Sequence, residues 1–214
     1  ERGKAELVDT RDLIVTDSSF GSARVEYGET RDRIQKRLKS GSGIFVVTGF
    51  IASTPQGEVT TLGRGGSDYT ASLIAAALLV PELEIWTDVD GVLTADPKKV
   101  SKALPLHHVS YAEMMELAHF GAKVVYPPTM HPVMHEGIPI RIKNTFNTAF
   151  SGTLISSTAA AAGRMISGVT SVPDVALIQV EGSGMIGVAG TSMRLFRALA
   201  ARSISVIFIS QASS

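Results

Sequence analysis

The stretch TLGRGGSDYTASLIAAAL, from Thr61 to Leu78, decides how this chain folds and where its chemistry lies. It predicts a helix that opens with an arginine, a glycine pair, a serine and an aspartate. The glycines let backbone N–H groups approach a ligand closely, and Ser67 is predicted to cap the helix. Arg64 adds a planar fork of donors that suits a carboxylate or a phosphate. The run therefore predicts an anion site in which Asp68 organises a cation or a lysine. The alternative is a plain glycine-rich helix entry with a solvated arginine and aspartate.

The residues on either side of this helix predict strands. Ile44 to Thr48 (IFVVT) is a continuous apolar run between glycines, as expected of a strand buried on both faces. Residues 50–58 predict a loop, the helix is expected to run to about Leu79, and a second strand is expected over residues 83–87. This order of strand, loop, helix and strand implies a right-handed crossover and a parallel sheet.

A second polar motif follows the predicted strand at 83–87. It reads TDVDGVLTADPKKV, from Thr87 to Val100, and ligands of open α/β sheets bind at the carboxyl ends of strands. Asp88, Asp90 and Asp96 are candidates for holding a metal ion or ribose hydroxyls. A calcium loop is the rival interpretation, and it is disfavoured because the spacing lacks the glutamate at loop position twelve and a preceding helix.

Two further helices and a strand are predicted in the first 150 residues. Residues 30–39 predict an exposed helix with a thin apolar stripe. Ser110 and Glu113 form a capping box that opens a second helix, whose methionines are expected in the core. Residues 138–142 (IPIRI) alternate like a strand. Between them lies Lys123, a lone basic residue with apolar neighbours, which on the residues alone favours a surface lysine.

The five histidines invite a metal hypothesis, since His131 and His135 are four residues apart. Pro132 lies between them, and Glu136 follows the second histidine. The zinc-protease pattern requires the glutamate directly after the first histidine. Structural histidines and no metal site are therefore predicted.

The composition is typical of a globular protein. Of the 214 residues, 44% are hydrophobic and 19% are charged, which is ample apolar material for a core. Twenty basic and twenty acidic side chains cancel, and this argues against nucleic acid or a membrane surface as a partner. The absence of cysteine excludes disulfides, thiolate metal sites and cysteine nucleophiles. No apolar run is long enough to span a membrane and no signal peptide is present, so the expected location is the cytoplasm.

The C-terminal part predicts a small α+β module. A small and featureless segment precedes it, as a linker would. A strand, a glycine-rich loop, a helix and another strand are predicted over residues 175–180, 182–190, 191–201 and 205–209. This order is that of the first half of such a module.

Several of these motifs resemble one known family. GRGGSDYTA, EIWTDVDGVLTADPKKV, FGAKVVYPPT and SGTLI together resemble the aspartokinases of the amino-acid-kinase superfamily, and the C-terminal piece resembles the ACT regulatory domain that follows their kinase domain. GFIASTPQGE, IKNTFN and ISQASS look most like the form fused to homoserine dehydrogenase. The resemblance implies the C-terminal part of a kinase domain over residues 1–157, a linker over 158–168 and a truncated ACT domain over 169–214. The implied fold class is α/β, with a parallel-rich sheet sandwiched by helices and then a partial α+β ACT domain.

The resemblance implies an aspartate kinase. Such an enzyme transfers the γ-phosphoryl group of ATP to the β-carboxylate of L-aspartate in the biosynthesis of threonine, methionine and lysine. Residues that would hold the aspartate carboxylate are Arg64, Gly65, Gly66 and Ser67. Asp68 would act in catalysis by placing a lysine near the transferring phosphoryl group.

The resemblance also implies a nucleotide site, formed by Thr87, Asp88, Leu93, Lys98 and Lys123. Leu93 takes the place of a tyrosine found in some relatives. Lys98 replaces a common arginine, which keeps the charge but loses the fork of donors. Mg²⁺ is expected to bind mainly through the phosphates of ATP, so no dedicated metal cage is predicted in the protein.

The resemblance also implies how the protein is regulated and which of the family's motifs this sequence lacks. Gln211 is implied in sensing an amino-acid effector, most plausibly threonine, and ACT domains imply a homo-oligomer. The family's N-terminal lysine–phenylalanine–glycine–glycine motif and an upstream glutamate have no counterpart here, so the chain is expected to be a fragment that is inactive alone. The alternatives are another amino-acid kinase, acting on acetylglutamate or glutamate, and a non-catalytic module that senses an amino acid.

Overall fold

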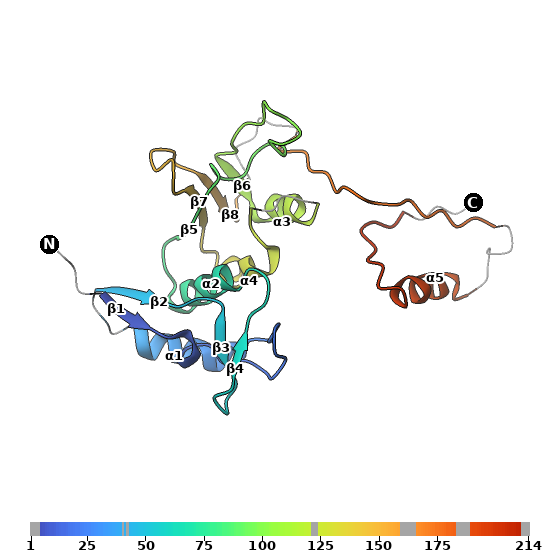
Figure 1. Ribbon diagram of the computed structural model, residues 1–214. Coiled ribbons are helices and arrows are strands. Elements are labelled where there is room, and N and C mark those ends of the chain that lie inside the picture. The colour runs from blue at the N-terminus through green and yellow to red at the C-terminus, as the bar shows by residue number, and fades with distance from the viewer. Residues whose placement is uncertain are drawn as a thin grey trace. The chain divides into compact units, whose positions relative to one another are not determined.

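The computed structural model describes residues 5–39, 41, 43–120, 124–158, 166–182 and 189–210. The chain divides into two compact units, Glu1–Val172 and Pro173–Ser214 (Figure 1). The helical elements of the first unit are η1 (Thr10–Asp12), α1 (Tyr27–Leu38), α2 (Gly66–Leu78), α3 (Tyr111–His119) and α4 (Pro127–His135). Its strands are β1 (Ala5–Val8), β2 (Ile44–Val47), β3 (Ile51–Ser53), β4 (Val59–Thr61), β5 (Leu83–Thr87), β6 (His108–Ser110), β7 (Ile140–Asn144) and β8 (Thr153–Ser156).

The strands form an α/β arrangement in which parallel pairs prevail. The largest sheet has the order β5-β7-β8-β6, with β5–β7 and β6–β8 parallel and β7–β8 antiparallel. Strands β1 and β2 form a parallel pair, and β3 and β4 form an antiparallel hairpin. The predicted α/β class is thus confirmed. The expected crossover is wrong, because β2 and β5 belong to different sheets.

Helix α2 connects the two hydrophobic cores of the first unit. Ala75 belongs to the core formed by the four-stranded sheet with α3 and α4. Leu73 and Ala77 belong to the other core, which includes β1 and α1. A helix that is apolar on all sides must be covered on all sides, and α2 meets this demand by lying between the two cores and beside α4 (Figure 1). Its polar first turn therefore occupies a fixed place in the fold.

Two predictions on the segment before α2 are wrong. Strand β2 is not buried on both faces, since Ile44 is 60% exposed and only alternate residues face the core. Residues 50–58, predicted as a loop, contribute to the β3–β4 hairpin. The turn of the hairpin forms where the N–H of Thr54 donates to the carbonyl of Glu58, 2.9 Å apart, and Gly57 adopts φ +85°, a conformation that glycine tolerates.

The predicted capping box opens α3. The Ser110 hydroxyl accepts from the N–H of Glu113 at 3.1 Å, and the Glu113 carboxylate accepts from the N–H of Ser110 at 2.8 Å. Met114 is fully buried and Met115 packs against the same core, so the expected core face is confirmed. The strand predicted over 138–142 is β7, which begins two residues later at Ile140.

The second unit contains α5 (Thr191–Ala200), close to the predicted 191–201. In the described part of this unit no strand forms over 175–180 or 205–209. A strand requires a ladder partner, and these segments instead expose apolar side chains such as Leu177. Phe196 and residues 206–209 surround a hollow of about 370 Å³ beside α5. Among the described residues, none of the helices has the length and apolarity needed to cross a lipid bilayer.

Candidate active site

The first turn of α2 forms the floor of an open pocket. Gly65 is the N-cap residue and adopts the left-handed conformation, with φ +70° and ψ +16°. Ser67 is the second residue of the helix, and the helix start carries no side-chain capping bond, so the predicted serine cap is wrong. Gly65 occupies the N-cap position because only glycine adopts this left-handed conformation without strain. The N–H of Gly66 donates to the carbonyl of Gly63 at 3.0 Å, whereas the N–H groups of Ser67 and Asp68, which also line the pocket, have no partner within the helix.

The pocket has a volume of about 440 Å³ and is lined by Phe50 and the continuous run of residues 63–68. The structure thus brings the predicted aspartate-binding residues and Asp68 together. Arg64 and Ser67 are exposed, whereas Gly66 is buried beneath them. Among the described residues Arg64 makes no ion pair, which leaves its guanidinium available for an anion.

The glycines of this turn are required by close packing. A Cβ atom on Gly65 would lie 2.9 Å from Cγ2 of Thr129 and 3.1 Å from Cβ of Tyr126. A Cβ atom on Gly66 would lie 2.7 Å from the ring of Phe50. Neither position has room for a side chain without movement of its neighbours, so Gly65 serves the packing of α2 against α4 and Gly66 serves the packing of α2 against Phe50.

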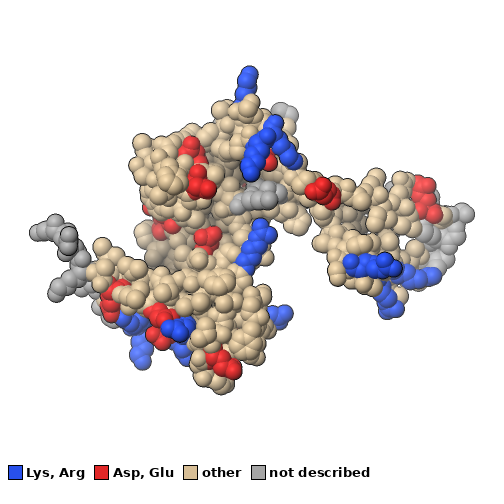
Figure 2. Space-filling model, in the orientation of Figure 1, with Lys and Arg blue, Asp and Glu red and all other residues tan. Residues whose placement is uncertain are grey.

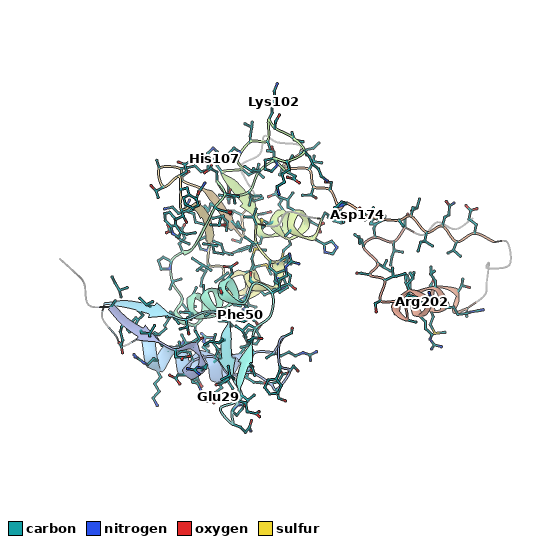
Figure 3. All side chains as sticks on the ribbon, viewed as in Figure 1. Glu29, Phe50, Lys102, His107, Asp174 and Arg202 are labelled. Carbon is teal, nitrogen blue, oxygen red and sulfur yellow. The ribbon has the colours of Figure 1, made fainter. Side chains whose placement is uncertain are left out.

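Phe50 is a pocket residue that its sequence context did not predict. It lies between β3 and α2 (Figure 3) and has φ +74°, which is uncommon for a bulky residue. Its N–H donates to Oγ1 of Thr70 at 3.1 Å, and that hydroxyl donates to the carbonyl of Gly66 at 2.8 Å. Thr70 therefore ties Phe50 to the first turn of α2. One feature of the sequence could have indicated Phe50 as a site residue. It is an aromatic residue that follows Gly49 just after the strand predicted over residues 44–48, and ligands bind at the carboxyl ends of strands.

Asp68 is half-buried in the pocket wall. Burial raises the pKa of its carboxyl group above the ordinary value, since desolvation disfavours the charged form. Among the described residues it forms no ion pair. Lys123, the lysine expected near this site, lies outside the described residues.

Four of the five predicted nucleotide residues lie at the last residue of β5 or on the segment that follows it. The hydroxyl of Thr87 donates to Oδ1 of Asp88 at 3.2 Å, and Asp88 is exposed. Leu93 forms an isolated bridge with Pro105, and the side chain of Lys98 is exposed. Of these four, none belongs to the described lining of the pocket at 63–68. Gln211 lies outside the described residues.

Three of the aspartates and histidines considered as metal ligands have other partners. Asp90 accepts from the side-chain amides of Asn144 and Asn147, and Asp96 accepts from the N–H of Lys98 at 2.9 Å. Nε2 of His108 lies 2.8 Å from the hydroxyl of Ser156. Across the described part of the chain, no three His, Asp or Glu side chains gather as metal ligands would. On the face shown in Figure 2, basic and acidic side chains are interspersed over the first unit.

Comparison with known proteins gives two matches along the chain. Residues 3–144 match the amino acid kinase family and residues 178–214 match an ACT domain. A bifunctional aspartokinase/homoserine dehydrogenase of Daucus carota, described as chloroplastic, is 43% identical over 99% of this chain. The chain spans only 24% of the length of that relative.

Two solved structures of E. coli aspartokinase III are similar to almost the whole chain. The form in complex with lysine and aspartate, the T-state, has a TM-score of 0.76. The form in complex with aspartate and ADP, the R-state, has a TM-score of 0.73. Both are 31% identical to this chain, over 98% of its length and 47% of theirs.

Proposed function

Because this chain belongs to the amino acid kinase family, we propose that it is part of an aspartate kinase. The pocket at the first turn of α2 is the observation that carries this proposal. It combines the Arg64 guanidinium, which forms no ion pair among the described residues, with helix-start N–H groups at Ser67 and Asp68 that have no partner within the helix. This combination suits a small carboxylate, and the similar E. coli enzyme was solved with aspartate.

In this proposal the pocket orients L-aspartate. Arg64 forms a bidentate pair with a substrate carboxylate, and the N–H group of Ser67 donates to the same carboxylate. The β-carboxylate is left free to attack the γ-phosphorus of ATP, which forms aspartyl phosphate and releases ADP. Such transfer depends on positioning and charge neutralisation more than on covalent catalysis by the protein. Asp68 contributes by holding a lysine cation close to the transferring group.

The nucleotide is proposed to bind along the segment after β5. Thr87, Asp88 and Leu93 would contact the nucleoside side, with Lys98 and Lys123 near the phosphates. Mg²⁺ fits this site as an ion carried by the nucleotide, because Asp88 offers one exposed carboxylate and the described residues hold no cluster of three ligands. When bound, the ion would neutralise the developing negative charge on the phosphates.

The C-terminal unit is proposed to bind an amino-acid effector as part of an ACT domain over residues 169–214, joined by a linker over 158–168 to kinase residues 1–157. The match to an ACT domain supports a regulatory role. Threonine as the effector, sensing through Gln211, and assembly into a homo-oligomer remain proposals. We also propose a dehydrogenase activity for the whole enzyme. The proposed location is the cytoplasm, whereas the carrot relative is described as chloroplastic.

Binding measurements test the proposal in this chain. We expect isothermal titration to detect Mg·ATP and L-aspartate, with Arg64→Ala abolishing aspartate binding and Lys123→Ala weakening nucleotide binding. Arg33→Ala is a matched control, because Arg33 is a surface arginine paired with Glu29 on α1. We expect no aspartate-dependent ATP turnover by the chain alone, since it lacks the family's lysine–phenylalanine–glycine–glycine motif. Stronger binding of acetylglutamate or glutamate than of aspartate would instead favour another amino-acid kinase.

A further inference from the structure

Asp90 is held by two side-chain amides from a different part of the chain. Its Oδ1 atom accepts from Nδ2 of Asn144 at 2.9 Å and from Nδ2 of Asn147 at 3.0 Å. Asp90 is half-buried and Asn144 is only 8% exposed. Hydrogen bonds to an ionised acceptor are roughly twice as strong as neutral ones, so this pair of bonds is a firm tie across 54 residues of sequence.

The turn that supplies these amides is itself ordered by hydrogen bonds. Oδ1 of Asn144 accepts from the N–H of Phe146 at 2.8 Å, so its amide nitrogen must face Asp90. The N–H of Asn147 donates to the carbonyl of Asn144 at 3.2 Å, and the N–H of Phe150 donates to the carbonyl of Asn147 at 3.1 Å. An acceptor that is held by this turn is therefore held in a defined position.

The same turn also fixes the end of β5. In the register of the sheet Thr87 pairs with Asn144, and the carbonyl of Thr87 accepts from the N–H of Thr145 at 2.8 Å. Asp88 thus follows one fixed point, the end of the strand, and precedes another, Asp90. The Thr87 hydroxyl adds the 3.2 Å contact to Oδ1 of Asp88. The backbone around Asp88 is constrained while its carboxylate remains exposed.

We propose that Asp90 is a positioning residue that fixes Thr87 and Asp88 for contact with the bound nucleotide, by tying their loop to the turn after β7. The inference rests on the nucleotide site proposed above and adds a residue with no contact to the nucleotide itself. Among the described residues both hydrogen-bond partners of Asp90 are neutral amides, so its carboxylate is available to hold the loop.

Two measurements on the 214-residue chain test the inference. Hydrogen–deuterium exchange without nucleotide reports on the backbone of residues 88–92, and isothermal titration gives the Kd values of Mg·ATP and L-aspartate. Asp90→Ala is expected to speed exchange in this loop and to raise the Kd of Mg·ATP roughly tenfold, as loss of two charge-assisted bonds would. The Kd of L-aspartate should stay within about twofold of its original value, because its pocket lies at α2.

Three further variants keep the result interpretable. Asp90→Asn retains an oxygen acceptor and should restore most of the nucleotide affinity. Asn147→Ala removes one bond from an exposed side chain and should raise the Kd of Mg·ATP about two- to threefold. Glu82→Ala is the matched control, because Glu82 makes a bidentate pair with Arg141 at the opposite end of the same two strands. It should leave the Kd of Mg·ATP unchanged.

The outcomes separate this inference from the proposed function. If the unmodified chain does not bind Mg·ATP, the nucleotide site is wrong and the role of Asp90 is refuted with it. If the chain binds Mg·ATP and Asp90→Ala binds it equally well, only the positioning role is refuted. Equal losses of Mg·ATP and L-aspartate affinity, or unchanged exchange over residues 88–92, would also refute it by showing a general structural effect or no tie at all.

Discussion

The guanidinium of Arg64 lies over the ring of Tyr126, with its Cζ atom 5.4 Å from the ring centroid. Arg64 precedes α2, and Tyr126 is the N-cap residue of α4. The carbonyl of Tyr126 accepts from both the N–H and the hydroxyl of Thr129, at 2.9 and 2.6 Å. The aromatic ring is thus attached to a well-held backbone, and it gives the exposed arginine a preferred place beside the pocket.

Tyr126→Leu is expected to weaken L-aspartate binding by roughly two- to fivefold, the loss of a cation–π contact at an exposed site. Tyr126→Phe keeps the ring and should bind normally. Isothermal titration of both variants makes the comparison. Equal affinities of the leucine and phenylalanine variants would contradict a role for the ring, and the thermal melting of each variant controls for damage to α4.

Gly65→Ala is expected to destabilise the fold by more than backbone strain alone. A Cβ atom there would meet Thr129 at 2.9 Å in addition to requiring φ +70°. Gly57→Ala is the matched control, because Gly57 has φ +85° and open space around its Cα. We expect about 1 kcal/mol of destabilisation at Gly57 and about 2–3 kcal/mol at Gly65. Chemical denaturation measures both, and equal values would show that α4 yields to the extra methyl group.

Asp68→Asn is expected to stabilise the protein at neutral pH. Burial raises the pKa of Asp68 above 3.8 in the folded chain, so below pH 3.8 the carboxyl group is protonated in both states and has no differential effect. As the pH rises through the folded pKa, the ionised group bears a desolvation cost that the asparagine avoids. The melting temperature of the variant should exceed that of the parent at pH 7, and the gain should vanish as the pH falls below 3.8. A difference in melting temperature between variant and parent that does not change with pH would contradict a raised pKa for Asp68.

Much of the first unit could be predicted because its signals are local. The helix at 66–78 and the strand at 83–87 follow from apolar runs between glycine and proline, and Ser110 with Glu113 marks a helix start within four residues. The run GRGGSD likewise predicts a site at the start of α2, where the structure has a pocket, and its use for an anion stays a prediction. Such features depend on neighbours in sequence, which is why the sequence alone locates them.

The remaining features depend on partners distant in sequence. Nothing near Phe50 indicates that Thr70 and Gly66 will hold it at positive φ, and Tyr126 meets Arg64 only because α4 packs on α2. Strand β2 looks fully buried in sequence, but the side chains on one face of it, Ile44 and Val46, are exposed. Helix α4 is hard to predict because its sequence contains three prolines. The first two occupy the opening helical positions, where no N–H is needed.

Ser110→Ala is expected to cost about 1 kcal/mol of stability by removing the cap of α3. The cost should depend on pH, because bonds from Ser167, and then those from Ser110, lower the pKa of Glu113 below its ordinary value. The stabilising effect of the ionised Glu113 is complete above pH 4.5 and is lost as the pH falls through the folded pKa. Glu116→Gln, on the same helix, controls for helix charge. Urea unfolding at pH 7 and pH 3.5 should show the difference between Ser110→Ala and the parent shrinking at the lower pH.

Thr153→Val tests how the segment after β5 is anchored beyond Asp90. The Thr153 hydroxyl is fully buried, accepts from the N–H of Val92 at 2.8 Å and donates to the carbonyl of Leu106 at 2.5 Å. Valine keeps the shape but leaves both backbone groups without this partner, which should cost about 2–4 kcal/mol. Thr153→Ser keeps the hydroxyl and should cost about 1 kcal/mol for the lost methyl group.

Chemical denaturation of the valine and serine variants distinguishes burial of the methyl group from the hydrogen bonds. Gly91 packs closely on Thr153, and a Cβ atom built on Gly91 would lie 2.3 Å from Oγ1 of Thr153. In the valine variant we therefore expect no room for a water molecule that could take over the hydrogen bonds of the hydroxyl. If the valine variant is no less stable than the serine variant, Val92 and Leu106 have found new partners and the segment can rearrange. A larger loss for valine would mean that the Thr153 hydroxyl anchors this segment at Val92, two residues beyond Asp90.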